Sequence, residues 1–184
     1  MNAITRRNFL WATVMAGIYQ AFAQAQDKPD FTGLRTRRDW QKARAHILAG
    51  MQLVMGQLPP RQKLPLEIKK LVVTETSAFT RTKIQYLSEP GDFVDAHLLI
   101  PKNLKRKAPA ILCLHQTIKI GKDEPAGLGG NPNLHYAKEL AERGFVCIVP
   151  DYPYLGENTF DPYQNGSISC TMKGIVNHRR AVDV

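Results

Sequence analysis

Cysteine is scarce in this 184-residue sequence, which contains only Cys113, Cys147 and Cys170. An odd number of cysteines cannot form a complete disulfide framework, and no C-x-x-C spacing indicates a structural zinc site. Cys113 and Cys147 lie in apolar runs, so we expect free core thiols, although neighbouring parallel strands could bring them close enough to bridge in an oxidising compartment. The composition excludes a small protein stabilised by disulfides.

The sequence also lacks an apolar run of the length that spans a bilayer. The N-terminal run, Phe9–Phe22, has 14 residues, whereas a transmembrane helix needs about 18 or more. Arg6 and Arg7 precede it and small residues follow it, which predicts a twin-arginine-type signal peptide over residues 1–25, cleaved after Ala23 or Ala25. We therefore expect export to the periplasm or the medium, after transient contact with the export machinery.

Aromatic residues are few, at 8%, and neither of the basic clusters, at 35–38 and 102–107, contains one. The formal charge is +9, and loss of the two signal arginines leaves +7. A basic protein that binds single-stranded nucleic acid would interleave aromatic rings for base stacking. These clusters therefore indicate solvated loops, and we expect no nucleic-acid partner.

The first half of the sequence predicts one helix followed by antiparallel strands. Apolar residues at spacings of three and four over 36–57 indicate an amphipathic helix, which Pro59 and Pro60 end. Segments 66–76, 81–89 and 93–101 are rich in β-branched and aromatic residues and are separated by turn residues. We assign residues 26–65 to a linker with this helix, and residues 66–184 to the main domain.

The pattern changes at Ala110 to that of an α/β protein. Continuous apolar runs at 110–115 and 145–152 flank an amphipathic helix at 133–144, and a last helix is predicted over 171–184. Strands that are apolar on both faces belong in a parallel sheet, and ligands bind at its carboxyl edge. Two long loops, 115–130 and 151–167, are expected to meet at that edge.

These motifs and their order resemble the α/β-hydrolases. "LLIPKNLKRKAPAILCLHQT" resembles the fold's antiparallel approach to the strand that carries the oxyanion turn, "VPDYPYLGEN" resembles the turn after the next strand, and "TMKGIVNHRRAVDV" is similar to the helix before the nucleophile. The likeness covers Arg81–Val184 and is greatest to exported dienelactone hydrolase-like and acetyl esterase-like bacterial proteins. It implies an α/β fold class, with only the N-terminal half of the α/β-hydrolase fold present: antiparallel lead-in strands and then a parallel β-α-β sheet.

The resemblance also implies roles for several residues. The oxyanion hole would use the backbone N–H of Thr117, with that of Gln116 as the neighbouring candidate. His115 would brace the loop, because the catalytic histidine of these enzymes follows the nucleophile in the chain. Tyr152, Tyr154 and Phe160 either line a substrate pocket or pack their loop onto the sheet. No cofactor is expected, since a serine mechanism needs none.

The nucleophile motif Gly-x-Ser-x-Gly occurs nowhere in the sequence, and Ser167 and Ser169 lack the preceding apolar strand that such an elbow requires. We therefore expect an N-terminal fragment, truncated before the nucleophile elbow and inactive alone. The complete protein would be a serine hydrolase of small-molecule or carbohydrate esters: an esterase, a deacetylase or a dienelactone hydrolase-like enzyme. The alternative is a non-catalytic periplasmic ligand-binding module or a hydrolase remnant. The sequence does not indicate an oligomeric state.

The composition of the loop at 115–130 also suggests a zinc site or a phosphate-binding loop, but the spacing favours neither. His115, Asp123, Glu124 and His135 could supply zinc ligands, but they lack tight ligand spacing, so no metal site is predicted. The glycines at 127, 129 and 130 do not open a helix directly after a strand, as a phosphate-binding loop does.

Overall fold

A computed structural model of the chain describes residues 31–166 and 169–184. The predicted signal peptide and Ser167 lie outside these residues. The chain divides into two compact units, with the boundary between Gln57 and Leu58.

The first unit contains the predicted amphipathic helix, α2, which spans Arg37–Met55. A capping box begins it: Asp39 N–H donates to Thr36 Oγ1 over 3.1 Å, and Thr36 N–H donates to Asp39 Oδ2 over 2.9 Å. This reciprocal pair satisfies two amides that the first helical turn leaves without partners. The helix ends at Gly56, and none of its residues is buried.

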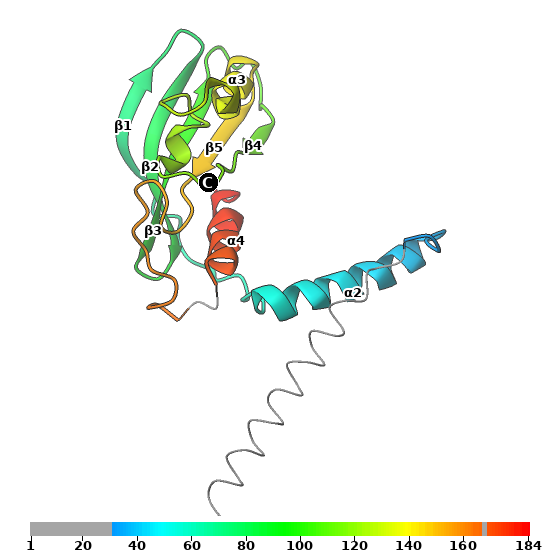
Figure 1. Cartoon of the computed structure of the whole chain (residues 1–184). Coiled ribbons are helices and arrows are strands. Elements are labelled where there is room, and N and C mark those ends of the chain that lie inside the picture. The colour runs from blue at the N-terminus through cyan, green and yellow to red at the C-terminus, as the bar shows by residue number, and fades with distance from the viewer. Residues whose placement is uncertain (1–30, 167–168) are drawn as a thin grey trace, which may run out of the picture. The chain divides into compact units, whose positions relative to one another are not determined.

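The second unit is built on one mixed sheet (Figure 1). Its strands are β1 (Lys69–Glu75), β2 (Phe79–Glu89), β3 (Asp92–Pro101), β4 (Ala110–Leu112) and β5 (Val146–Pro150), in the order β1-β2-β3-β5-β4. The pairs from β1 through β3 to β5 are antiparallel, and β4 pairs with β5 in parallel. The predicted change from antiparallel lead-in strands to a parallel unit is therefore confirmed. β4 is shorter than predicted, although Cys113 N–H still donates to Ile148 O over 2.8 Å.

Two helices cover the two faces of this sheet. Alternate residues of β5 point to opposite faces, so Cys147 and Val149 pack with α3 (Tyr136–Glu142) while Ile148 packs with α4 (Cys170–Ala181). Cys113 belongs to the same buried cluster as Cys147, on the sheet face that α3 covers, and both are buried free thiols, as predicted.

The helix predicted over 133–144 divides into two parts: a short 3-10 turn, η2 (Pro132–Leu134), and then α3. Another 3-10 turn, η1 (Gly121–Asp123), lies in the preceding loop. Within the described residues, no helix combines the length and apolar character that crossing a membrane requires.

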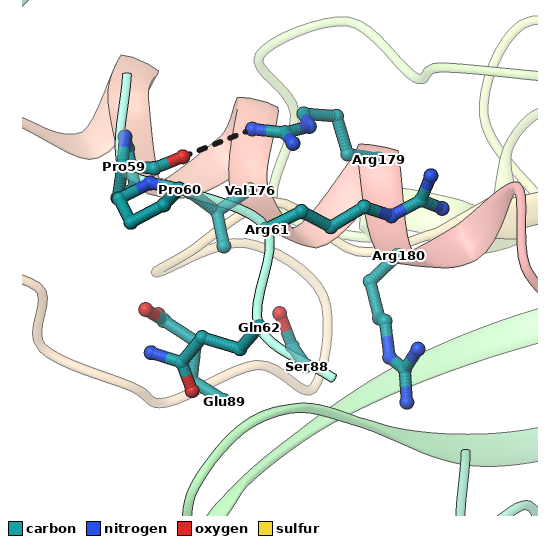
Figure 2. A pocket seen from close by; sticks show the side chains of 9 residues that line it. All are labelled: Pro59, Pro60, Arg61, Gln62, Ser88, Glu89, Val176, Arg179 and Arg180. Atoms are coloured by element: carbon teal, nitrogen blue, oxygen red, sulfur yellow. Dashed lines mark hydrogen bonds between the residues drawn. The ribbon is translucent and has the colours of Figure 1, made fainter. Parts of the chain in front are cut away.

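Buried polar contacts hold α4 on β2. The hydroxyl of Tyr86 donates to the carbonyl of Asn177 over 3.0 Å, and that of Ser88 donates to Asn177 Oδ1 over 2.6 Å. Arginines of α4 also reach the segment that precedes β1, where Arg179 Nη1 donates to Pro59 O over 3.2 Å (Figure 2). The cavity between them is only about 30 Å³, enough for a water molecule but not for a substrate.

Tyr86→Phe is expected to lower the free energy of unfolding by about 1 kcal/mol, the net value of a buried hydrogen bond. Urea denaturation measures the change. The matched control, Tyr163→Phe, removes the hydroxyl of an exposed ring and should change stability by less than about 0.5 kcal/mol. Equal values for both variants would contradict the packing of α4 on β2.

Candidate active site

The candidate site lies where the loops after β4 and β5 meet. Because these strands are parallel neighbours, their carboxyl ends lie at the same edge of the sheet. Ligands of open α/β sheets bind at that edge. The first loop carries His115, Gln116 and Thr117, and the second begins at Asp151.

Asp151 is fully buried and joins the two loops. Its Oδ1 accepts the Lys122 N–H over 2.8 Å, and its Oδ2 accepts the Glu157 N–H over 3.0 Å and the Lys122 ammonium over 2.7 Å. The backbones of Gly121 and Gly156, both at positive φ, lie close against this carboxylate. A Cβ at either glycine would lie 2.2 or 2.1 Å from Oδ1, so only glycine fits at these two positions.

The buried ammonium of Lys122 has two carboxylate partners, since Glu157 Oε2 also lies 2.8 Å from it. Burial lowers the pKa of Lys122, but Asp151 and Glu157 outweigh that effect and raise the pKa above its ordinary value. Hydrogen bonds from Lys122 and Lys83 in turn lower the pKa of Glu157. Lys122 and Glu157 are therefore both charged at neutral pH. This ion pair was not predicted from the sequence. Its one signal there is a lysine that stands directly after a glycine and before two acidic residues of the loop.

His115 has a fully buried side chain that binds main-chain atoms on both loops. Its Nε2 accepts the Tyr152 N–H over 3.1 Å, which assigns the proton to Nδ1, and Nδ1 donates to Gln116 O over 2.7 Å. Asp151 Oδ1 lies 3.7 Å from Nε2, and in this tautomer no proton lies between them. The imidazole thus holds the backbone in place and has neither nitrogen free for proton transfer.

Gln116 and Thr117 are exposed at the start of the loop. Neither residue is among the described non-glycine residues with positive φ, so the backbone here is one that residues other than glycine adopt without strain. Across residues 31–166 and 169–184, no backbone or side-chain acceptor bonds either of these two N–H groups. Both amides are thus available to a ligand.

The three aromatic residues of the second loop lie in different surroundings. Tyr152 packs edge-on between His115 and His178, with ring centroids 5.1 and 4.5 Å away. Phe160 lies beneath the Lys173 ammonium at 4.6 Å, and Tyr154 is half exposed. Within the described residues, the ring contacts of this loop are those of Tyr152 with the two histidines, and none joins two of the three aromatic residues.

The four residues weighed as zinc ligands are engaged separately. Asp123 bonds His97 Nε2 over 2.8 Å, Glu124 bonds Gln116 Nε2 over 2.9 Å, and His135 Nε2 bonds a backbone carbonyl of its own loop over 2.9 Å. Together with the main-chain bonds of His115, these contacts leave no shared ligand position. No group of three potential metal ligands occurs among the described residues.

Lys122→Met should lower the free energy of unfolding by about 3 kcal/mol or more, because it leaves the Asp151 charge buried without its cation. The control Lys138→Met removes an exposed lysine 3.9 Å from Glu142 and should cost less than about 1 kcal/mol. Both values come from urea denaturation. A loss below 1 kcal/mol for Lys122→Met would show that the pair does not hold the loops.

Burial, and secondarily the proximity of His115, lowers the pKa of His178 to about 4. The unfolded chain binds this proton near pH 6.5 and the folded chain only near pH 4, so stability should fall as pH falls through this window. The loss approaches about 3 kcal/mol at about 1.4 kcal/mol per unit. Urea denaturation at several pH values should show this slope disappear in His178→Leu and persist in His46→Leu, a change at an exposed position. The same slope in both variants would contradict the assignment.

Comparisons with known proteins agree with this architecture. The model of the Abhydrolase family matches residues 8–168. The structure resembles that of a proposed acetyl xylan esterase from Bacteroides fragilis NCTC 9343, with a TM-score of 0.66 and 17% sequence identity. The likeness covers 90% of this chain and 48% of the other, so the chain spans about half the length of that protein. No curated protein sequence matches the chain.

The family match extends over most of the sequence, and the sheet order, the β4-loop-α3-β5 unit and the structural likeness point to the same fold. The five-stranded sheet with a helix on each face is part of the α/β-hydrolase fold. This chain therefore belongs to the Abhydrolase family of α/β-hydrolases.

Proposed function

We propose that this chain forms the oxyanion side of a serine hydrolase that acts on carboxylic esters. The observation that carries the proposal is the pair of free amides at Gln116 and Thr117, at the carboxyl end of β4. When a serine oxygen attacks an ester carbonyl, the carbonyl oxygen becomes negative, and N–H groups already aimed at it stabilise the transition state. The buried bonds of Asp151 and His115 hold the loop, so these donors need no reorganisation during the reaction.

The nucleophile, the base and the acid would come from sequence that this chain does not contain. Gly-x-Ser-x-Gly is absent from the 184 residues. Ser169 begins α4, where its hydroxyl accepts the Met172 N–H over 3.1 Å as an N-cap, a structural task. We therefore infer that the chain alone does not hydrolyse esters.

The far side of β4 is suited to receive a further strand. β4 is the last strand in the order of the described sheet, so one side of its backbone has no strand partner there. An apolar groove of about 300 Å³ lies beside it, lined by residues that include Ile111 and Leu112 of β4, Leu98 of β3 and Ala181 of α4. An unpaired edge next to an apolar groove is a surface that folded proteins normally cover. A strand that continues the sheet, and that ends in the nucleophile turn, would cover both.

The substrate that we propose first is an acetyl ester on a carbohydrate, because acetyl xylan esterase activity is proposed for the structural neighbour. Other small-molecule esters and lactones require the same oxyanion donors and differ only in their acyl and leaving-group pockets. A polymeric carbohydrate lies outside the cell, and a twin-arginine-type signal over residues 1–25 would export the enzyme to it.

Thr117→Pro tests the proposal, in an enzyme that includes this chain and the sequence that follows it in the gene. Proline removes the Thr117 N–H, which has no acceptor among the described residues, so folding should be preserved. Loss of one oxyanion donor should lower kcat for an acetyl ester about 10²- to 10³-fold.

The control is Thr117→Ala, which keeps the backbone N–H and should retain nearly full kcat. Circular dichroism and thermal unfolding would establish that both variants fold. Full activity in a folded Thr117→Pro enzyme would remove this amide from the mechanism. Activity in the isolated chain that is lost on labelling of Ser167 or Ser169 would overturn the proposed division of the site.

A further inference from the structure

Glu124 is a second buried carboxylate in the loop after β4, and its surroundings differ from those of Asp151. It is only 1% exposed. Asp151 has the Lys122 ammonium as a partner, whereas no lysine, arginine or histidine within the described residues forms an ion pair with Glu124. Burying a carboxylate without a cation costs several kcal/mol unless hydrogen bonds replace its hydration. Such a residue therefore needs a specific reason for its position.

The two oxygens of Glu124 bind two separate parts of the loop. Oε2 accepts a hydrogen bond from Gln116 Nε2 over 2.9 Å, and Oε1 accepts one from the Asn131 N–H over 3.0 Å. Asn131 is the N-cap of η2, where its side chain accepts the Asn133 N–H over 3.1 Å. Glu124 thus connects the turn that carries the free amides to the start of the segment that leads into α3.

The backbone around Glu124 leaves room for its carboxylate. Gly130 has φ +73°, and a Cβ there would lie 2.3 Å from Oε1. Any other residue at 130 would displace the carboxylate and would also be strained in the left-handed region. This close approach shows that the loop accommodates the acid at this place and that the acid does not merely occupy a space left by packing.

The hydrogen bond to Glu124 also sets the orientation of the Gln116 side chain. Its NH₂ group faces Glu124, because Gln116 Nε2 donates to Oε2 over 2.9 Å, and its own amide oxygen is turned away. On the other side, the carbonyl of Gln116 accepts the proton of His115 Nδ1 over 2.7 Å. The residue is therefore held by its side chain and its main chain at once, and its N–H and that of Thr117 remain free.

We propose that Glu124 is a positioning residue for the oxyanion donors: through the Gln116 side chain it orders the Gln116–Thr117 turn and directs both N–H groups to the carboxyl edge of the sheet. The inference rests on the proposed function for the use of these amides, but the ordering of the turn can be measured in this chain by itself.

The experiment compares the 184-residue chain with Gln116→Met, Glu124→Gln and the double variant, by ¹⁵N relaxation and by titration with methylphosphonate. Gln116→Met removes the same contact from an exposed position, so it tests the proposal even if a change at buried Glu124 prevents folding. Asp123→Asn is the matched control: it neutralises the adjacent acid, which bonds His97.

In the wild type and in Asp123→Asn, the amides of Gln116 and Thr117 should show order parameters near the value of rigid backbone, about 0.85. Gln116→Met should bring both to about 0.6 or below, the value of flexible backbone, and the double variant should be no more mobile than either single one. The apparent affinity for methylphosphonate, read from the Thr117 amide shift, should weaken about threefold to tenfold, because an unordered turn must be ordered on binding.

The proposal is overturned if Gln116→Met leaves both amides as ordered as in the wild type, or if Glu124→Gln loosens Asn131 alone. If the variants loosen the turn but methylphosphonate shifts neither amide in the wild type, the positioning role of Glu124 is supported and the proposed oxyanion function fails. The two proposals are therefore tested separately.

Discussion

The rest of the site depends on the buried carboxylate of Asp151. The two loops that it joins follow different strands, so no local turn or helix bond could fix one against the other. Lys122 and Glu157 direct two backbone amides and one ammonium at this carboxylate, and glycines at 121 and 156 allow the main chain to approach it. A buried charge with this many partners holds its position strongly, because separating them leaves uncompensated charge in the interior. This group, together with the His115 bonds to Gln116 and Tyr152, holds the two loops in their mutual position.

The hydrogen bonds of His115 and Glu124 hold the first turn of the loop and leave its backbone donors unsatisfied. His115 holds the carbonyl of Gln116, and Glu124 holds its side chain, while the N–H groups of Gln116 and Thr117 have no acceptor in the described chain. Exposed backbone donors in a fixed turn cost little in the resting protein, since water satisfies them. They stabilise a transition state in which negative charge develops beside them, because no energy is then needed to orient them. The hydrogen bonds that hold the loops and the proposed chemistry therefore have a common physical basis.

Much of this architecture could be predicted from the sequence, because period and composition report burial on each face. Alternating segments at 66–101 and continuous apolar runs at 110–115 and 145–152 predicted the antiparallel and parallel parts of the sheet, and the turn after β4 was placed at His115–Thr117. The ion pair of Lys122 with Asp151 could not be predicted, because its partners are 29 residues apart on loops whose path no periodicity reports. The same limit applies to Tyr152 and Phe160, whose neighbours His178 and Lys173 come from a distant helix.

The proposed mechanism depends on a Thr117 N–H that is already positioned to bind an oxyanion. A crystal structure of the complete enzyme after its nucleophilic serine has reacted with an organophosphonate tests this most directly. We predict a phosphoryl oxygen at about 2.7–3.1 Å from Thr117 N, with Glu124 still bound to Gln116. A phosphoryl oxygen that points to solvent, with the Thr117 amide bound only to water, would contradict the account.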